Sequence, residues 1–244
     1  MINIQHLSKQ FGGFKAVDDL SLSVDAGETL VLLGTSGCGK TTTLRMLNRL
    51  VEPDSGTIYI DGIDVREQPA PELRRRIGYV IQDGGLFPHY TVAEAIATVP
   101  RLLNWTPDII DQRTRELLDK LQLPVGSLSR YPSELSGGQR QRVGLARALA
   151  VRPPVVLMDE PFGALDPFTR RHVRRELFGL TELSETTVVL VTHDVSEALE
   201  LADRIALMDK GRLVQIGTPD ELLQRPATDF VRDFLDDKPH RLRG

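Results

Sequence analysis

The residues from Gly34 to Thr41 have the types and spacing needed to bind a triphosphate, in the pattern G-x-x-x-x-G-K-[ST]. Glycines let successive backbone N–H groups point at one anion with no Cβ in the way. A helix that begins at the end of the loop adds partial positive charge at the same place. Lys40 could place a full charge on the β- and γ-phosphates, and the Thr41 hydroxyl could ligate Mg²⁺.

A second stretch, Leu135-Ser136-Gly137-Gly138-Gln139, has the same physical character. Ser136 is a suitable N-cap residue for the helical pattern that follows. Gly137 and Gly138 would leave the first backbone N–H groups of that helix uncovered. We therefore expect a second anion site at this helix start.

Three further polar side chains follow apolar runs of strand type. Asp159 and Glu160 end the run Val-Val-Leu-Met, and His193 follows Val188 to Val191 by one residue. Ligands of parallel sheets bind at the carboxyl ends of the strands. We predict that Asp159 holds Mg²⁺ through its water shell, that Glu160 polarises an attacking water, and that His193 is functional.

The elements that must position these residues alternate between strand and helix patterns. Leu30 to Leu33 is a short buried strand, and Leu44, Leu47 and Leu50 recur at helical spacing after the loop. Residues 1–27 alternate apolar and polar residues around Gly12-Gly13, as a β-hairpin does. A further buried strand is predicted over Ile77–Ile81, and Gln82 follows it directly.

From these patterns we expect an α/β fold with a phosphate-loop core, a mainly parallel sheet and an N-terminal antiparallel β subdomain. Helical patterns dominate residues 88–150, which predicts a helical subdomain inserted in the core, and residues 227–244 form a C-terminal tail of one domain spanning 1–244. Val173, Leu177 and Leu180 mark an amphipathic helix. Its other face carries four arginines that we expect to be solvated: Arg170, Arg171, Arg174 and Arg175.

Composition narrows the classes of protein that fit. The chain has 244 residues, 41% of them hydrophobic and 26% charged, with a net charge of −4. An acidic balance disfavours a general nucleic-acid binder. Apolar runs are too short to span a membrane, and the N-terminus lacks the apolar core of a signal peptide. These features predict a protein that stays in the cytosol.

Two residues have alternative interpretations. The ring of Phe11 could stack on an adenine, or it could be an ordinary core or surface phenylalanine. Cys38, the single cysteine, lies inside the phosphate loop. It could act as a redox sensor, because a helix N-terminus lowers a thiol pKa, but a small residue that fills a loop position is the simpler interpretation.

Together these motifs resemble the ATP-binding cassette (ABC) family, the nucleotide-binding subunits of ABC transporters, from about residue 2 to residue 226. The phosphate loop, Gln82, the LSGGQ stretch, Asp159-Glu160, the Ala164-Leu165-Asp166 loop and His193 occur in family order. LSGGQ is the discriminating element, because other phosphate-loop ATPases lack it.

The resemblance implies a role for each matching residue, with ATP and Mg²⁺ as cofactors. Glu160 would be the general base, and Lys40, Gln82 and His193 would complete the catalytic group. Thr41, Gln82 and Asp159 would hold the metal. The nucleotide would contact Phe11, Gly34, Thr35, Ser36, Gly37, Cys38, Gly39, Lys40, Thr41, Thr42, Ser136, Gly137, Gly138, Gln139 and Asp166.

The resemblance also implies partners. Ser136 and Gly138 would act on ATP held by a second copy in a head-to-tail dimer, with Asp166 at the seam. Family members work at the cytoplasmic face of the inner membrane, bound to permease subunits, and indirectly serve an extracytoplasmic solute-binding protein. We expect no nucleic-acid partner.

Residues 82–105 are similar to importers of osmoprotectants. Leu-Phe-Pro-His follows Gln82, and the run Val99 to Trp105 resembles ATPases for glycine betaine, choline, carnitine or proline-type solutes. This segment would receive a helix of the permease. Ala95 departs from the asparagine often found there. Many of these ATPases also continue into paired CBS domains that sense ionic strength, which the printed sequence does not reach.

The function that we expect is ATP-driven uptake of a compatible solute. The alternative within transport is an importer ATPase for another polar solute, such as an amino acid. A third hypothesis is an ABC ATPase in DNA repair or translation. Such proteins usually carry long coiled-coil insertions or two cassettes, and neither is found in this sequence.

Overall fold

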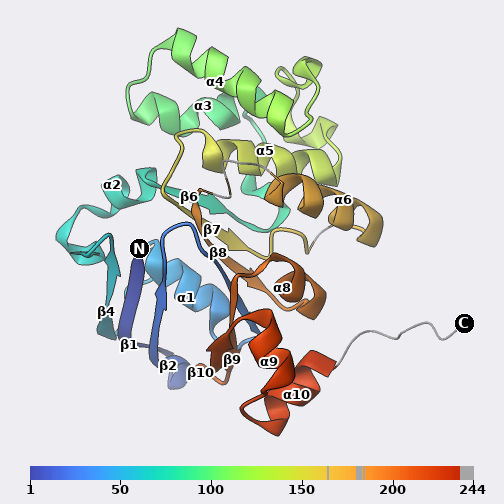
Figure 1. Ribbon diagram of the computed structural model, residues 1–244. Coiled ribbons are helices and arrows are strands. Elements are labelled where there is room, and N and C mark those ends of the chain that lie inside the picture. Colours follow the sequence, from blue (N-terminus) through green and yellow to red (C-terminus); the bar gives the residue numbers. More distant parts are fainter. Residues whose placement is uncertain (164, 180–182, 184, 237–244) are drawn as a thin grey trace, which may run out of the picture. The chain divides into compact units, whose positions relative to one another are not determined.

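The computed structural model describes residues 1–163, 165–179, 183 and 185–236 (Figure 1). Ala164 of the expected loop, Leu180 of the expected amphipathic helix and residues 237–244 of the expected tail lie outside the described residues. The chain forms two compact units, Met1–Ala70 with Val189–Gly244, and Pro71–Val188. Within the described residues, no helix is long and apolar enough to cross a membrane.

The first unit contains an antiparallel sheet with the strand order β2-β1-β4-β5. Its strands are β1 (Ile2–Phe11), β2 (Phe14–Val24), β4 (Ser55–Ile60) and β5 (Ile63–Asp64). Ile4 is paired with Leu22, and Phe11 with Phe14 at the hairpin tip. Ile2, Ile4 and Leu7 are almost fully buried. The period-two pattern of the sequence therefore produced the antiparallel sheet that we expected.

The same unit contains a second set of strands. β3 (Thr29–Gly34) is parallel to β9 (Arg204–Asp209), which forms a hairpin with β10 (Arg212–Gly217). β8 (Thr187–Thr192) follows β3 in the strand order, with its last four residues in this unit. The helices are α1 (Lys40–Leu47), α8 (Val195–Leu201), α9 (Pro219–Gln224) and α10 (Asp229–Asp236), with the 3₁₀ turn η1 (Val65–Glu67).

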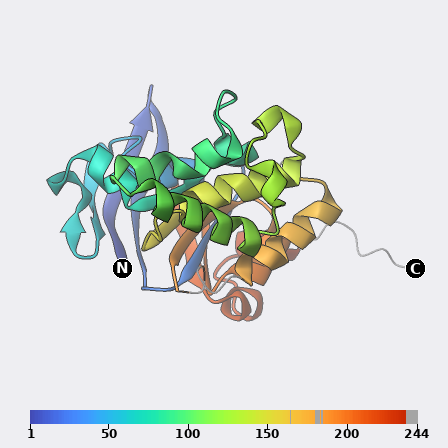
Figure 2. The ribbon, with the colours of Figure 1, turned by 90° about the horizontal axis from the view of Figure 1, so that it is seen from above.

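The second unit pairs β6 (Ile77–Val80) in parallel with β7 (Val155–Asp159). The remaining elements are α2 (Ala70–Arg75), α3 (Val92–Leu102), α4 (Pro107–Lys120), α5 (Gly137–Leu149), α6 (Pro167–Phe178) and the 3₁₀ turns η2 (Gln82–Gly85), η3 (Val125–Ser127) and η4 (Pro132–Glu134). Both views show α3, α4 and α5 side by side (Figures 1 and 2). These helices fall within residues 88–150, the range of the expected helical subdomain.

The turn η2 is fastened to α5. The Arg147 guanidinium donates to the carbonyl of Gly85 at 2.6 Å. A Cβ on Gly144 would lie 2.7 Å from the Gly84 carbonyl oxygen, so the two backbones approach too closely for a side chain. Because η2 carries Gln82, the helix that begins at the LSGGQ stretch also supports the glutamine.

A charge cluster fastens α4 to the end of α5. The Glu116 carboxylate lies 2.9 Å from Arg113 and Lys120 and 3.1 Å from Arg152. Arg113, which is 3% exposed, also donates to the carbonyls of Leu149 and Ala150. Hydrogen bonding to Lys120, aided by Arg113, lowers the pKa of Glu116 to about 2.

The α/β class, the antiparallel N-terminal sheet and the mainly parallel arrangement are confirmed. The strand expected to end at Ile81 ends at Val80, and Ile81 is 36% exposed. One expectation for α6 is wrong. Arg174 is only 7% exposed, and Arg170 is half-buried and donates to the Leu165 carbonyl at 3.1 Å, while Arg171 and Arg175 are exposed.

We expect Glu116→Gln to lower the free energy of unfolding by on the order of 1–2 kcal/mol at pH 7. This loss of stability is between the values typical of exposed and of buried ion pairs, because the Glu116 carboxylate is 34% exposed. A carboxylate whose pKa is depressed on folding stabilises the fold above its unfolded value of 4.5, and loses that effect as the pH falls toward about 2. Urea unfolding at pH 7 and pH 3 measures the difference.

The control is Asp111→Asn, which removes an exposed pair with Arg115 on the same helix. It should change stability by less than about 0.5 kcal/mol. A Glu116→Gln effect as large at pH 3 as at pH 7 would contradict the assigned pKa.

Candidate functional site

The phosphate loop in the first unit lies between a fully buried strand and a helix start. All six residues of β3 are buried, and α1 begins at Lys40. The Lys40 ammonium donates to the carbonyls of Gly34 at 2.8 Å and Thr35 at 2.9 Å. Its side chain is therefore held over the loop, although Lys40 is only 5% exposed.

Two glycines of the loop are required by the surrounding backbone. Gly39 has a φ of 104° and Gly34 a φ of 149°. A Cβ on Gly39 would lie 2.2 Å from the Ala16 carbonyl oxygen of β2, and one on Gly34 would lie 2.2 Å from that of Met208 in β9. The two glycines are therefore needed because β2 and β9 pass close to the loop, as well as because the loop must leave its N–H groups uncovered.

The structure favours the simpler interpretation of Cys38. The side chain is buried, and burial raises the pKa of its thiol, an effect that Lys40 partly offsets. A protonated, buried thiol is a poor nucleophile and a poor redox sensor. Cys38 contributes to the loop through its backbone, since its carbonyl accepts a hydrogen bond from Gly211.

The first unit also places Phe11 and His193. Phe11 ends β1 at the hairpin tip, is 49% exposed, and has the Lys9 ammonium 5.3 Å from its ring centroid. His193 is exposed in the tight connection between β8 and α8. Asp194 fixes this connection by accepting from the backbone N–H groups of Ser196 and Glu197.

The second unit brings Gln82 and Glu160 near each other. A Cβ on Gly163 would lie 3.6 Å from both Gln82 Nε2 and Glu160 Oε2. Glu160 has a φ of 45°, which is uncommon for a residue other than glycine and is typical of functional sites. Asp159 ends the buried strand β7 and is 9% exposed.

The LSGGQ stretch forms a capping box. The Ser136 hydroxyl accepts from the Gln139 N–H at 3.2 Å, and the Gln139 side chain accepts from the Ser136 N–H at 2.9 Å. Ser136 is therefore the N-cap that we expected. Gly138 is buried, and a Cβ there would lie 3.0 Å from the Thr169 methyl group, so a side chain at this position would be tightly packed against α6.

Asp166 has a structural function at the start of α6. Its carboxylate accepts from the backbone N–H groups of Phe168 and Thr169, both at 3.1 Å. Donation from Thr169 lowers the pKa of this carboxyl. The remaining expected contacts lie in the loop and its helix: Thr35, Ser36 and Gly37 are exposed, and Thr41 and Thr42 are half-buried.

Two groups that support the site were not found from the sequence. Arg147 holds the turn after Gln82, and Asp18 binds the chain next to the phosphate loop. Both lie in segments that look like ordinary helix and strand, so no local pattern marks them. Their function is seen only from their contacts with residues distant in the sequence, Gly85 for Arg147 and Gly211 for Asp18.

Comparisons with known proteins agree with this geometry. A family model described as ABC transporter matches residues 17–163. The chain is 56% identical to the glycine betaine uptake system ATP-binding protein YehX of Escherichia coli, with 96% of this chain and 76% of YehX covered. It is 52% identical to the glycine betaine/carnitine/choline transport ATP-binding protein OpuCA of Bacillus subtilis and spans 62% of OpuCA's length.

A solved structure is also similar to this chain. The dimeric structure of MJ0796, a bacterial ABC transporter cassette, matches with a TM-score of 0.80 and 33% sequence identity. The match covers 90% of this chain and 99% of MJ0796.

We expect Gly39→Ala to lower the free energy of unfolding by about 2–4 kcal/mol, because a left-handed backbone and a clash with the Ala16 carbonyl combine. Gly126→Ala is the matched control, since a Cβ there meets nothing within 4 Å. Urea unfolding of both variants checks the prediction. Equal stability of the two variants would show that the loop can adopt another backbone conformation.

Proposed function

The chain belongs to the ABC transporter family, and we propose that it is the ATP-hydrolysing subunit of an importer for a compatible solute such as glycine betaine, choline or carnitine. The observation that carries the proposal is the 56% identity to YehX over 96% of this chain. The phosphate loop and the capped LSGGQ helix provide the chemistry that such a subunit requires.

In this proposal the phosphate loop binds ATP. Backbone N–H groups of residues 34–41 surround the phosphates, and the Lys40 ammonium moves from the loop carbonyls to the β- and γ-phosphates. The exposed ring of Phe11 stacks on the adenine.

The oxygen groups that the sequence supplies suit Mg²⁺. The Thr41 hydroxyl, the Gln82 amide oxygen and the Asp159 carboxylate would hold the ion, and hard oxygen ligands are those that Mg²⁺ prefers. The ion would supply positive charge that offsets the charge of the phosphates during transfer. The near-complete burial of Asp159 suits a carboxylate that acts on a cation.

Glu160 would be the general base. Its carboxylate accepts a proton from the water that attacks the γ-phosphorus, and ADP leaves with the bond to the γ-phosphate broken. The strained backbone of Glu160 and the nearby amide of Gln82 support this role, since both limit the positions that the carboxylate can take. His193 would donate a hydrogen bond to the γ-phosphate.

The proposal includes a second copy of the chain. Ser136, Gly137, Gly138 and Gln139 at the start of α5 would complete the ATP site of the partner, with Asp166 at the seam. The helix start offers uncovered N–H groups and partial positive charge to the γ-phosphate. The dimeric MJ0796 cassette supports this arrangement.

The permease would dock on the second unit near residues 82–105, at the cytoplasmic face of the inner membrane. A groove of about 310 Å³ is lined by Ala97, Trp105, Ile110 and Leu128, with Arg101 and Asp111 also on its wall. An apolar helix face with charged flanks would fit these surroundings. Solute recognition would then lie in the permease and in an extracytoplasmic binding protein.

We expect Glu160→Gln to bind ATP but to hydrolyse it about 10²–10⁴-fold more slowly, the usual range for loss of a general base. Slow hydrolysis should trap the ATP-bound dimer, which size-exclusion chromatography with and without ATP would detect. Glu72→Gln, an exposed carboxylate on α2, is the control and should behave as wild type. A Glu160→Gln chain that stays monomeric in saturating ATP would contradict the shared site.

The transport role is tested by uptake of labelled glycine betaine at high osmolarity. Cells that lack this protein are compared with cells given wild type or Glu160→Gln. Restoration by wild type alone is the expected result, because import requires hydrolysis. Uptake that is the same in all three strains would remove glycine betaine as the solute, and labelled choline and carnitine would be tested next.

A further inference from the structure

We propose that Asp18 is a positioning residue that fixes the hairpin tip carrying Phe11 relative to the phosphate loop. The inference rests on the proposed function, in which Phe11 receives the adenine and Lys40 the phosphates. ATP can use both contacts at once only if their separation is held constant. Asp18 would contact neither the base nor the phosphates, and it would act through the segments that it joins.

The tip has little packing of its own. Phe11 and Phe14 are paired across the hairpin and are 49% and 61% exposed. Gly12 and Gly13 between them have φ values of 52° and 90°, and a Cβ on either would meet nothing within 4 Å. The position of the tip must therefore be set by contacts lower on β1 and β2.

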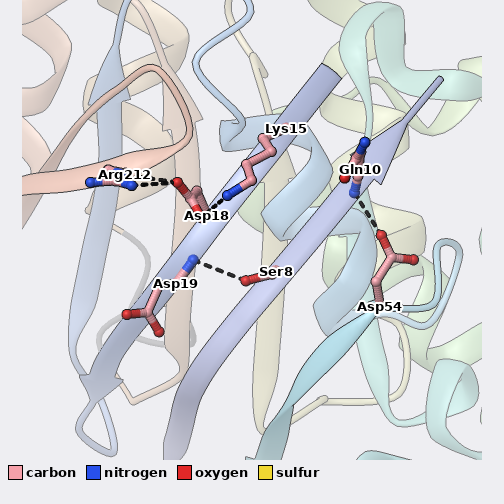
Figure 3. Close-up of polar contacts among 7 residues, drawn as sticks. All are labelled: Ser8, Gln10, Lys15, Asp18, Asp19, Asp54 and Arg212. Atoms are coloured by element: carbon pink, nitrogen blue, oxygen red, sulfur yellow. Dashed lines mark hydrogen bonds and ion pairs between the residues drawn. The ribbon is translucent and has the colours of Figure 1, made fainter. Parts of the chain in front are cut away.

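Asp18 makes the contact on the β2 side (Figure 3). Its Oδ2 accepts from Arg212 Nε at 2.9 Å and Nη2 at 2.7 Å, and its Oδ1 accepts from Lys15 Nζ at 3.1 Å. Arg212 begins β10, whereas Lys15 lies next to the tip. One carboxylate thus links the tip to the hairpin of β9 and β10.

The backbone continues this link to the phosphate loop. The Asp18 N–H donates to the Gly211 carbonyl at 2.9 Å, and the Gly211 N–H donates to the Cys38 carbonyl at 3.1 Å. Lys210 and Gly211 form the turn between β9 and β10, with φ values of 46° and 83°. Two hydrogen bonds and one turn therefore connect Asp18 to the loop with Lys40, in addition to the direct approach of Ala16 to Gly39.

Two other aspartates, Asp54 and Asp19, also bind the hairpin, but their contacts do not reach the phosphate loop. Asp54 accepts from the Gln10 backbone N–H and from Lys9, both at 2.7 Å, which ties the β1 side to the turn before β4. The Asp19 carboxylate lies 2.8 Å from His6 Nδ1, and the Asp19 N–H donates to the Ser8 hydroxyl. Both contacts stay within the same hairpin. Of these three acids, Asp18 is the one whose contacts reach the phosphate loop.

The test compares Asp18→Asn with Asp19→Asn, which change the same group at adjacent positions. Calorimetry measures the binding of two probes, ATP and inorganic triphosphate, to the full chain with Mg²⁺. We expect Asp18→Asn to weaken ATP binding about three- to tenfold, because charge-assisted bonds are lost. Triphosphate binding should change by less than about twofold, since the loop itself is built by β3 and α1. Asp19→Asn should match wild type with both probes.

Arg212→Gln approaches the same contact from the other side and should reproduce the Asp18→Asn result. Equal effects of Asp18→Asn and Asp19→Asn on ATP, or equal losses of ATP and triphosphate binding by Asp18→Asn, would overturn the inference. A wild-type chain that binds ATP no better than triphosphate would also overturn the inference about Asp18. That outcome would not contradict the proposed ATPase function. A wild-type chain that binds neither probe would instead remove the proposed function.

Discussion

The structure depends on a constraint at the phosphate loop, where three segments of backbone meet with no room for side chains. The Ala16 carbonyl of β2 approaches Gly39, and the Met208 carbonyl of β9 approaches Gly34, each to a distance that a Cβ cannot tolerate. Lys40, the residue after Gly39, donates hydrogen bonds to the carbonyls of Gly34 and Thr35. Strands from both ends of the chain thus fix the loop before any ligand binds, which reduces the ordering cost of binding a phosphate group.

The second unit uses the same device for different residues. Gly84 and Gly144 bring η2 against α5, and Arg147 secures the turn by a bond to Gly85. Burial lowers the pKa of Arg147, because a desolvated guanidinium is less stable in its charged form. The helix that presents Ser136 and the turn that presents Gln82 therefore act as one body.

Several residues of the proposed site also maintain the fold. Ser136 and Gln139 close a capping box, Asp166 caps α6, and Gly138 permits α6 to pack on α5. Substitution of these residues would change local structure as well as chemistry.

The sequence by itself determined the α/β class, the antiparallel hairpin of residues 1–27, the loop that starts α1 at Lys40, and the cap at Ser136. Each depends on a local pattern: period-two burial, glycine at fixed offsets, or a side chain that bonds three residues along the chain. Tertiary structure decided the rest. It buried Arg174 on a face that looked solvated, buried the Cys38 side chain so that its thiol pKa is raised, and joined Asp18 to Arg212, which is 194 positions away. Such contacts leave no periodic signal, because they form only when segments distant in the chain pack together.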